Sequence, residues 1–439
     1  MKPARGTRWF LVALILIGLL GWIVGGSVIF ARLTYFSLVL MAGAYFWSLL
    51  SMRGIRLTRQ ARILRASVGD LFEERFEIVN SVRQSCAWLE IDDQSALPLA
   101  EGSRLLTRIA GRQKRSYTAR TWLTRRGAFP LGPTVLTSGD PFGLFTLQTR
   151  SQAQGVLVVL PMTVSISAFP VPPGLLPGGK AIRQKTMDVT PHAAGVREYV
   201  PGDPMKRIHW PSTAHRQRLM VKEFEQDPQA EIWLFLDAQR VVHSALPQSE
   251  MQPLGEFWWM HRRVRIKLPE DSFEHAVSAA ASLARHFLAD RRVVGLACAG
   301  GKFTVVPAER GERQVGKIME TLAFLQAEGD LPLLGLVTMQ AKLLPIGSGV
   351  ILITTSLQSD LLLAIENLHR WSLRPVVVLL KSEGFGGAEG DAAIVEALLN
   401  RNIPLCQIAC GDDLASALGQ PAAYFRRPAI PNPAAYAVR

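Results

Sequence analysis

The sequence predicts three successive parts: two transmembrane helices, a small all-β sandwich and a doubly wound α/β domain. Three observations support this order. Two long apolar runs lie near the N-terminus, apolar and polar residues alternate from about residue 55 to 160, and apolar strands alternate with helical segments from Glu231 onward. A chain of 439 residues is long enough for about two to four domains.

The first predicted helix covers residues 9–30 and the second covers residues 33–50, with Ala31 and Arg32 between them. The first run is uncharged and reaches the roughly 20 residues that cross a bilayer as a helix. The second run is slightly short, but it ends in aromatic residues that suit the membrane interface. A cleaved signal peptide would explain only the first run. We therefore expect residues 1–52 to form a transmembrane hairpin.

Positive charge is concentrated around this hairpin. The chain has a formal net charge of +13, and no acidic residue occurs before Asp70. Because Lys and Arg collect on the cytoplasmic side of membrane helices, we expect both termini and the rest of the chain in the cytoplasm. A basic chain also suggests nucleic acid as a partner, but these charges flank apolar runs, so we expect no nucleic-acid partner. The basic residues before Asp70 are Lys2, Arg5, Arg8, Arg32, Arg53, Arg56, Arg59, Arg62 and Arg65.

The cysteines agree with this location. Cys86, Cys298, Cys406 and Cys410 are sparse and lack the spacing of a zinc site. Cys406 and Cys410 are close in the sequence, but the run IPLCQIAC has the pattern of a strand. We therefore interpret the cysteines as buried apolar thiols.

Residues 53–165 are predicted to form the β-sandwich. Runs such as FEERFEIVNSV and RSYTARTWLT alternate, and Asn, Gly and Pro turns separate them. Near the end of this region, RRGAFPLGPTVLTSGDPFGLF contains glycines and prolines that specify tight turns. We expect Phe142, Leu144 and Phe145 to plug one end of the sandwich. Residues 166–192 are rich in Pro and Gly and are predicted to form a linker.

Residues 229–422 are predicted to form the α/β domain, and residues 423–439 a tail. EIWLFLDA (231–238) is a continuous apolar strand, FEHAVSAAASLARHFLAD (273–290) is an amphipathic helix, and further strands and helices alternate after it. No Gly-rich phosphate loop follows a strand, so nucleotide binding is not expected. An insertion at 240–272 contains EFWWMHRRVRIKLPED, which suits a loop packed on its own domain, a membrane surface, a protein partner or single-stranded nucleic acid.

A polar segment, residues 193–228, lies between the linker and this domain. Its central run, REYVPGDPMKRIHWPSTAHRQRLMVKEFEQD, is too polar for a core and too irregular for one helix or strand. Pro201 and Gly202 suit a type II turn, after which Asp203 can cap a short helix. We expect that helix to end at Trp210, because a proline follows.

The same segment contains groups that suit catalysis. Asp203, His209 and His215 offer acid–base chemistry of the kind that a hydrolase uses. However, no nucleophile stands beside them in a strained turn, and their spacing matches no metal-binding helix. A structural or docking role is therefore favoured, in which Ile208 and Trp210 anchor the short helix to its domain.

The pattern R-E-Y-x-P-G-D-x-x-(K/R)-x-I-x-W, followed by T-A-x-x-x-x-L-x-V-K-x-F-E, resembles the signature of a bacterial family known as domain of unknown function 58. The runs RRGAFPLGP and DPFGLF and the N-terminal pair of membrane helices are also similar to that family, so the resemblance covers most of the chain. We expect the signature residues to contribute to partner docking. The matching positions are Arg197, Tyr199, Pro201, Gly202, Asp203, Lys206, Ile208, Trp210, Ala214, Leu219, Lys222 and Glu225.

The resemblance also implies a function. In such proteins the C-terminal part is similar to a von Willebrand factor A domain. Members are typically encoded beside a MoxR-type AAA+ ATPase, often with a transglutaminase-like membrane protein. The resemblance therefore implies a non-enzymatic accessory protein of the bacterial inner membrane, which works with that ATPase in the assembly or maturation of protein complexes.

A von Willebrand A domain usually binds Mg²⁺ through a D-x-S-x-S run after its first strand, and metal-dependent protein binding is therefore an alternative function. The corresponding positions are Asp237, Gln239 and Val241. Mg²⁺ requires oxygen ligands, and valine offers none, while Arg240 adds a repelling charge. We therefore expect the affinity for Mg²⁺ at Asp237 to be weak or lost, and we expect no other cofactor.

Overall fold

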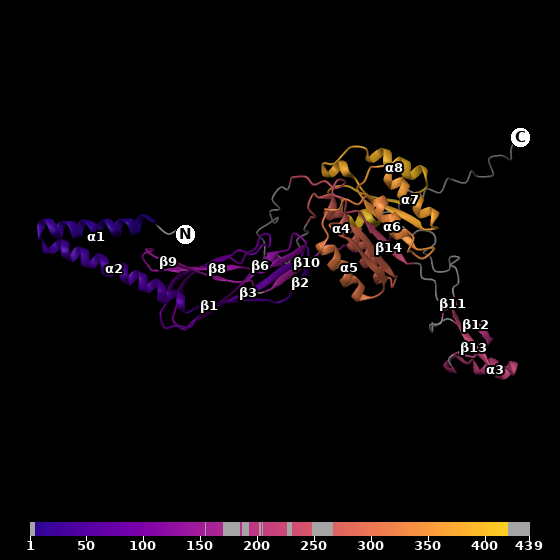
Figure 1. Cartoon of the computed structure of the whole chain (residues 1–439), viewed down its shortest axis with the longest axis horizontal. Coiled ribbons are helices and arrows are strands. Elements are labelled where there is room, and N and C mark those ends of the chain that lie inside the picture. Colours follow the sequence, from indigo (N-terminus) through magenta and orange to yellow (C-terminus); the bar gives the residue numbers. More distant parts are fainter. Residues whose placement is uncertain are drawn as a thin grey trace, which may run out of the picture. The chain divides into compact units, whose positions relative to one another are not determined.

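The protein is described by a computed structural model. Contacts divide the chain into two compact units, and the boundary falls between Pro161 and Met162. The first unit contains the apolar helices and a β-rich region, and the second contains the signature segment and an α/β domain (Figure 1). The predicted tail and most of the predicted linker lie outside the described residues. The structure describes residues 5–153, 155–169, 185–186, 193–201, 203, 205–225, 231–247 and 267–419.

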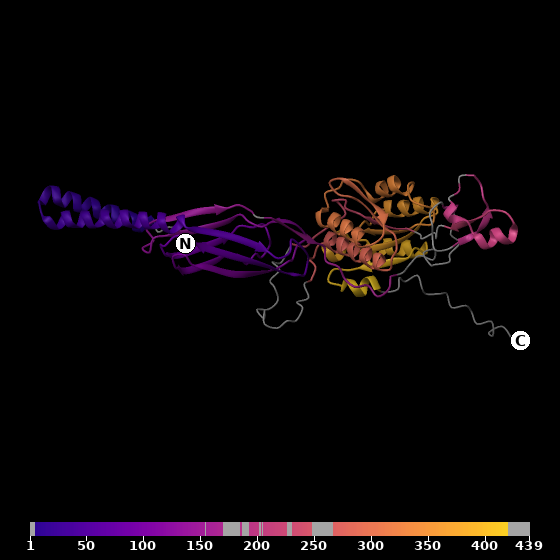
Figure 2. The ribbon, with the colours of Figure 1, turned by 90° about the horizontal axis from the view of Figure 1, so that it is seen from below.

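Two apolar helices, α1 (Arg5–Gly25) and α2 (Val28–Arg53), pack side by side as a hairpin (Figure 2). α2 is long and apolar enough to cross a membrane, whereas the apolar part of α1, Trp9–Gly25, is shorter. The apolar hairpin is thus present as predicted, and one of its helices has the length of a full span.

The position of the turn between these helices differs from the prediction. The chain turns at Gly26 and Ser27 instead of at Ala31 and Arg32. Gly26 has a φ of +62°, a conformation that glycine adopts without the steric cost of a side chain. Arg32 therefore lies within α2, so this helix carries a charged residue close to the turn.

The β-rich region consists of three small sheets. Their strand orders are β1-β3-β6, β5-β4-β8-β9 and β2-β10-β7, and the paired strands are antiparallel except for β2 and β10. β3 buries alternate residues because apolar and polar side chains alternate along it. The strands are β1 (Ile55–Ala61), β2 (Arg65–Ser67), β3 (Leu71–Asn80), β4 (Cys86–Asp93), β5 (Arg104–Ile109), β6 (Lys114–Trp122), β7 (Gly127–Pro130), β8 (Thr134–Gly139), β9 (Thr146–Ser151) and β10 (Val156–Leu160).

One buried core lies between the first two of these sheets. Phe76 and Ile78 of β3 belong to the same cluster as Leu89 and Ile91 of β4. Met52, from the last turn of α2, is part of this cluster as well. The core therefore attaches the apolar hairpin to the β-rich region.

The residues predicted to plug the end of this region are placed differently. Leu144 is buried in a cluster with Leu11 of α1 and Ala44 of α2, and Phe145 packs against that cluster. Phe142 is exposed. The turn that carries them therefore contacts the apolar helices instead of closing the sheets.

A buried ion network crosses the β-rich region. The Arg59 guanidinium donates to both carboxylate oxygens of Glu74, at 2.8 and 2.6 Å, and to those of Asp93, at 2.8 and 3.1 Å. It also lies 5.0 Å from the ring centre of Phe76, which is stacked on Tyr117. Such a network is stable only while each buried charge keeps its partner.

We predict that Arg59→Ala lowers the free energy of unfolding of the first unit by about 3–5 kcal/mol, because two buried carboxylates lose their partner. The matched control is Arg120→Ala, which removes an exposed pair with Glu73 and should cost about 1 kcal/mol or less. Urea titration of the full-length protein, followed by circular dichroism, measures both. Equal and small losses in the two variants would contradict the importance of the network.

The α/β domain is built on a six-stranded mixed sheet of order β16-β15-β14-β17-β18-β19. The strands are parallel except for the antiparallel pair β15 and β16, which confirms the mostly parallel sheet predicted from the apolar strands. Helices α4, α5 and α9 pack together on one face, and α6, α7 and α8 share a core with the other (Figure 1). The strands are β14 (Ile232–Leu236), β15 (Val294–Ala299), β16 (Phe303–Glu309), β17 (Gly349–Thr354), β18 (Arg374–Leu380) and β19 (Leu405–Ile408). The helices are α4 (Ser272–Ala289), α5 (Glu312–Phe324), α6 (Leu333–Ala341), α7 (Asp360–Arg370), η2 (Ser382–Phe385), α8 (Asp391–Asn400) and α9 (Leu414–Gly419).

Candidate functional site

The signature segment folds as a small antiparallel sheet with a short helix. β13 (Met220–Glu225) pairs with β12 (Ala193–Glu198) and with β11 (Lys185–Thr186). The 3₁₀ turn η1 (Met205–Arg207) and helix α3 (Trp210–Arg216) lie between β12 and β13 in the chain. The two halves of the signature are therefore brought together by strand pairing.

The short helix begins where the sequence predicted its end. Pro211 lies in the first turn of α3, where its missing N–H leaves no helical hydrogen bond unmade. Trp210, predicted to anchor the helix, is 66 % exposed, whereas Ile208 is buried as expected. The prediction for Trp210 was wrong, because the aromatic side chain stands at the surface of the segment.

Arg197 and Asp203 close the turn that follows β12. The guanidinium Nη1 and Nη2 donate to the two carboxylate oxygens of Asp203 at 2.7 and 2.6 Å. Asp203 also accepts a hydrogen bond from the Val200 N–H at 3.0 Å. A bidentate pair of this kind fixes geometry as well as charge, so it holds the loop in one conformation.

Backbone hydrogen bonds connect the two halves of the signature. The Tyr199 N–H donates to the Leu219 carbonyl and the His209 N–H to the Met220 carbonyl, both at 2.8 Å. Among the signature positions Ile208 is buried, while Gly202 and the side chain of Glu225 lie outside the described residues. The half-buried positions are Arg197, Tyr199, Asp203 and Lys222, and the exposed ones are Pro201, Lys206, Trp210, Ala214 and Leu219.

Asp203, His209 and His215 each have separate surroundings. Asp203 is bonded to Arg197, His209 Nδ1 lies 2.7 Å from the Ser212 hydroxyl, and His215 is exposed in the last turn of α3. Within the part of the chain that the structure describes, no three or more His, Cys, Asp and Glu side chains are grouped so that they could hold a metal ion. These surroundings do not form a catalytic constellation.

A second polar cluster surrounds Asp237, directly after β14. The adjacent parallel strand β17 ends at Thr354. After β14 the chain continues to β15 on one side, and after β17 it continues to β18 on the other side. Ligands of parallel sheets usually bind at the carboxyl ends of two strands from which the chain diverges in this way. Asp237 is 1 % exposed. Its Oδ2 accepts a hydrogen bond from the Thr354 hydroxyl at 2.6 Å, and its Oδ1 accepts one from the Gln239 N–H at 3.1 Å.

His243 completes this cluster. Its Nε2 donates to the Asp237 carbonyl at 2.9 Å, and its Nδ1 then accepts a hydrogen bond from the Ser272 hydroxyl at 3.1 Å. This arrangement fits the neutral imidazole, and burial lowers the pKa of His243. Burial also raises the pKa of the Asp237 carboxyl, although the hydrogen bonds from Thr354 and Gln239 favour its ionised form. Sequence analysis missed His243, because no motif marks it.

The residues at Asp237 do not fit a Mg²⁺ site. Both carboxylate oxygens are engaged by the protein itself, and Val241 is exposed and has no oxygen to offer. Mg²⁺ requires several oxygen ligands in near-octahedral geometry, and Asp237 alone cannot supply them. Weak or lost affinity for Mg²⁺ at Asp237 therefore stays a prediction.

The signature segment also matches known proteins. Residues 195–244 match the family described as "Protein of unknown function DUF58". Below, DUF58 segment denotes residues 195–244, the part of the chain that is similar to this family. Over 226 residues it is 25 % identical to "Uncharacterized protein YeaD" of Bacillus subtilis (strain 168), which makes that protein a distant homologue. The match covers 50 % of this chain and 48 % of YeaD, so it spans about half the length of that relative.

Similarity to solved structures is low. A Northeast Structural Genomics Consortium target, SoR45, matches 24 % of this chain and 87 % of its own at 15 % identity and a TM-score of 0.16. An inactive mutant of a GH20 exo-β-N-acetylglucosaminidase from Vibrio harveyi matches 45 % of this chain and 33 % of its own, at 10 % identity and a TM-score of 0.17. At TM-scores this low, neither match indicates a shared fold or activity.

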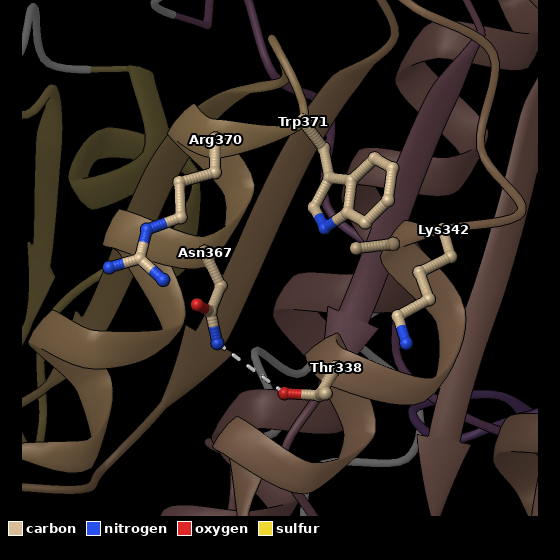
Figure 3. Close-up of a pocket in the computed structure, with 6 residues that line it drawn as sticks. Thr338, Lys342, Asn367, Arg370 and Trp371 are labelled. Atoms are coloured by element: carbon tan, nitrogen blue, oxygen red, sulfur yellow. Dashed lines mark hydrogen bonds between the residues drawn. The ribbon is translucent and has the colours of Figure 1, made fainter.

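A pocket of about 300 Å³ lies where helices α6 and α7 end, outside the DUF58 segment. Figure 3 shows the Lys342, Arg370 and Trp371 side chains around it, with the Asn367 amide donating to the Thr338 hydroxyl at 3.5 Å. Its lining offers cations, an amide and an indole but no carboxylate, thiol or imidazole. The pocket therefore suits binding of an anionic group, because the cationic side chains of Lys342 and Arg370 line it.

We predict that about 5 mM Mg²⁺ leaves the thermal midpoint of the full-length protein unchanged relative to EDTA, because a ligand stabilises only a protein that binds it. Differential scanning fluorimetry measures this. A rise with Mg²⁺ that Asp237→Asn abolishes would show that the site binds the metal after all.

We also predict that two histidines, the buried His275 and the half-buried His243, make the α/β domain sensitive to acid. Burial lowers the pKa of His243 and of His275 below the ordinary value of 6.5. As the pH falls through about 6.5, the unfolded chain binds protons that the folded chain does not, so the free energy of unfolding decreases; above that pH the contribution is fully present. The measurement is the fall in thermal midpoint between about pH 7.5 and pH 5.5.

The test compares variants, because the raised pKa of Asp237 acts in the opposite direction. The double variant His243→Gln/His275→Gln should lose less of its midpoint on acidification than the unchanged protein. His369→Gln, at an exposed histidine of α7, is the matched control and should behave like the unchanged protein. An equal fall in all three proteins would contradict the prediction.

Proposed function

We propose that this chain is a non-enzymatic accessory protein, anchored in the inner membrane of a bacterium by α1 and α2. In this proposal the β-sandwich, the DUF58 segment, a von Willebrand A-like α/β domain and both termini lie in the cytoplasm. The protein works with a MoxR-type AAA+ ATPase in the assembly or maturation of protein complexes, and a transglutaminase-like membrane protein is a further partner.

The observation that carries this proposal is a set of exposed apolar side chains on a segment whose backbone is held in one conformation. Met205, Trp210 and Leu219 are exposed in the DUF58 segment. Their backbone is fixed by the Arg197–Asp203 pair and by the pairing of β12 with β13. Exposed aromatic and methionine side chains on a rigid surface are typical of protein interfaces.

The charge around these side chains indicates the partner's surface. Lys206, Arg216 and Arg218 are exposed in the same segment. Arg218 has an acidic neighbour, Glu198, at 3.4 Å, with both side chains open to solvent. A partner that covers this surface would present apolar residues surrounded by acidic ones, because opposite charges at the rim favour encounter.

Membrane attachment is supported by the first unit. α2 has the length and apolar composition of a spanning helix, and Arg53, which ends it, is followed by further arginines. The alternatives have less support. A hydrolase would need Asp203, His209 and His215 to act together, and metal-dependent adhesion would need free oxygens on Asp237.

We predict that the tagged full-length protein, extracted in detergent, recovers a MoxR-type AAA+ ATPase when both are expressed together. Trp210→Ala should weaken binding by about 2 kcal/mol, roughly 30-fold, because exposed tryptophans are frequent interface hot spots. Quantitative pull-down at a series of ATPase concentrations measures the change. Failure to recover the ATPase with the unchanged protein would overturn the proposal.

The matched control is Trp371→Ala, which removes another exposed indole, 47 % exposed against 66 % for Trp210, from the pocket between α6 and α7. This variant should bind the ATPase as the unchanged protein does. A loss with Trp371→Ala but not with Trp210→Ala would place the docking surface on the α/β domain and remove the DUF58 segment from it.

A further inference from the structure

The two ends of α2 have different surroundings. At the C-terminal end, Ser48, Ser51 and Met52 are buried, and the Ser48 hydroxyl donates to the Phe145 carbonyl at 3.1 Å. This end of α2 packs against the β-rich region, so these three residues are not available to lipid. The rest of the helix, residues 28–47, has the roughly 20 residues and 30 Å that cross the apolar part of a bilayer.

The turn between β8 and β9, residues 140–145, extends past Ser48 along the membrane-crossing part of α2. Leu144 at its end is buried in a cluster with Leu11 of α1 and Ala44 of α2, and Leu40 packs against that cluster. Ala44 is one helical turn before Ser48, and Leu40 is two turns before it, which is about 12 Å along the helix. The turn therefore lies beside the part of the hairpin that is left to cross the membrane.

The conformation of this turn is fixed by a buried carboxylate. Asp140 is fully buried, and it accepts hydrogen bonds from the N–H groups of Phe142 at 2.8 Å, Leu144 at 3.2 Å and Phe145 at 2.6 Å. Gly143 has a φ of +71°, which lets the chain reverse between Phe142 and Leu144. Leu144 is thus directed to the helices, while Phe142 stays outside and is 65 % exposed.

Other exposed aromatics occur at the same level of the hairpin. Tyr45 packs edge-on against Phe145, with ring centres 5.5 Å apart, and Phe46 follows it. Both rings remain largely exposed, as does Trp9 near the start of the apolar part of α1. Aromatic side chains gather in this way where a membrane protein meets the boundary between headgroups and acyl chains.

We propose that the turn Asp140–Phe145 is a third membrane contact, in which Phe142 inserts into the headgroup–acyl boundary of the bilayer beside α1 and α2. This inference rests on the proposed anchoring of the hairpin in the membrane. It adds that the β-rich region touches the lipid surface directly, through one rigid turn. The contact would fix how far the membrane-proximal end of this region stands from the bilayer.

The test uses the full-length protein in vesicles of phosphatidylethanolamine and phosphatidylglycerol, with one cysteine carrying an NBD fluorophore. Cys86, Cys298 and Cys406 are buried and Cys410 is half-buried, so a Cys410→Ser background leaves no accessible thiol among the described residues. The probe position is Phe142→Cys, and the control is Ile63→Cys. Ile63 is exposed and lies just after β1, about 25 Å along the strand from the end of β1 that adjoins α2, at a strand's rise per residue.

At position 142 the NBD emission should shift to the blue and should be quenched by a lipid with a spin label near the headgroup. At position 63 the emission should stay as in water. A second measurement avoids the apolar fluorophore: a charged maleimide should modify Phe142→Cys about tenfold more slowly than Ile63→Cys, because thiolate formation is disfavoured in apolar surroundings.

Flotation of the same vesicles separates this inference from the anchoring on which it rests. Protein that floats with the vesicles while position 142 behaves like position 63 would overturn the contact and leave the anchoring intact. Protein that stays behind when the vesicles float would overturn both. The contact is supported if the protein floats with the vesicles, the NBD emission at position 142 is blue-shifted and quenched, and the thiol at position 142 reacts slowly with the maleimide.

Discussion

The join between α2 and the β-rich region is the constraint on which the rest of the first unit depends. Met52 is in the last turn of a continuous helix and also in the core formed by Phe76 and Leu89. Bending at this point would break either helical hydrogen bonds or a close-packed core. The β-rich region therefore keeps one orientation relative to α2. A given position along the helix always lies beside the same part of the β-rich region. Asp140 extends this rigidity to the turn that lies beside the helices.

Sequence patterns predicted the kinds of structure better than their boundaries. The apolar runs, the alternation in the β-rich region and the continuous apolar strands after Glu231 each reflect burial, and each produced the expected element. The turn of the hairpin was misplaced because hydropathy does not register backbone conformation. Gly25 and Gly26 lie inside an apolar run, and only the positive φ of Gly26 reveals the break. The sequence instead predicted the turn at Ala31 and Arg32, where the first charged residue interrupts the apolar run.

The candidate site was predictable only where it is local. Arg197 and Asp203 are six positions apart and both belong to the signature, so the sequence placed them in the same local segment. The bond between Asp237 and Thr354 joins residues 117 positions apart, and no spacing rule connects them. Trp210 was misjudged for a different reason: a tryptophan beside a proline suits an anchored helix end as well as an exposed helix start. The exposure of its side chain is decided by packing that the local sequence does not contain.

Several buried aspartates hold turns of the fold. Asp140 accepts the N–H groups of its own turn, Asp237 accepts the Gln239 N–H and the Thr354 hydroxyl, and Asp391 accepts the N–H groups of Ser382 and Glu383.

In each case the carboxylate satisfies backbone donors that regular secondary structure leaves unpaired. A general base needs a lone pair directed at its substrate, and these oxygens direct theirs at the protein. The same reasoning applies to Asp203, whose two oxygens meet the Arg197 guanidinium. Acidic groups in these places stabilise the loops of the fold. In the proposed function, the exposed apolar and basic side chains of the DUF58 segment contact the partner.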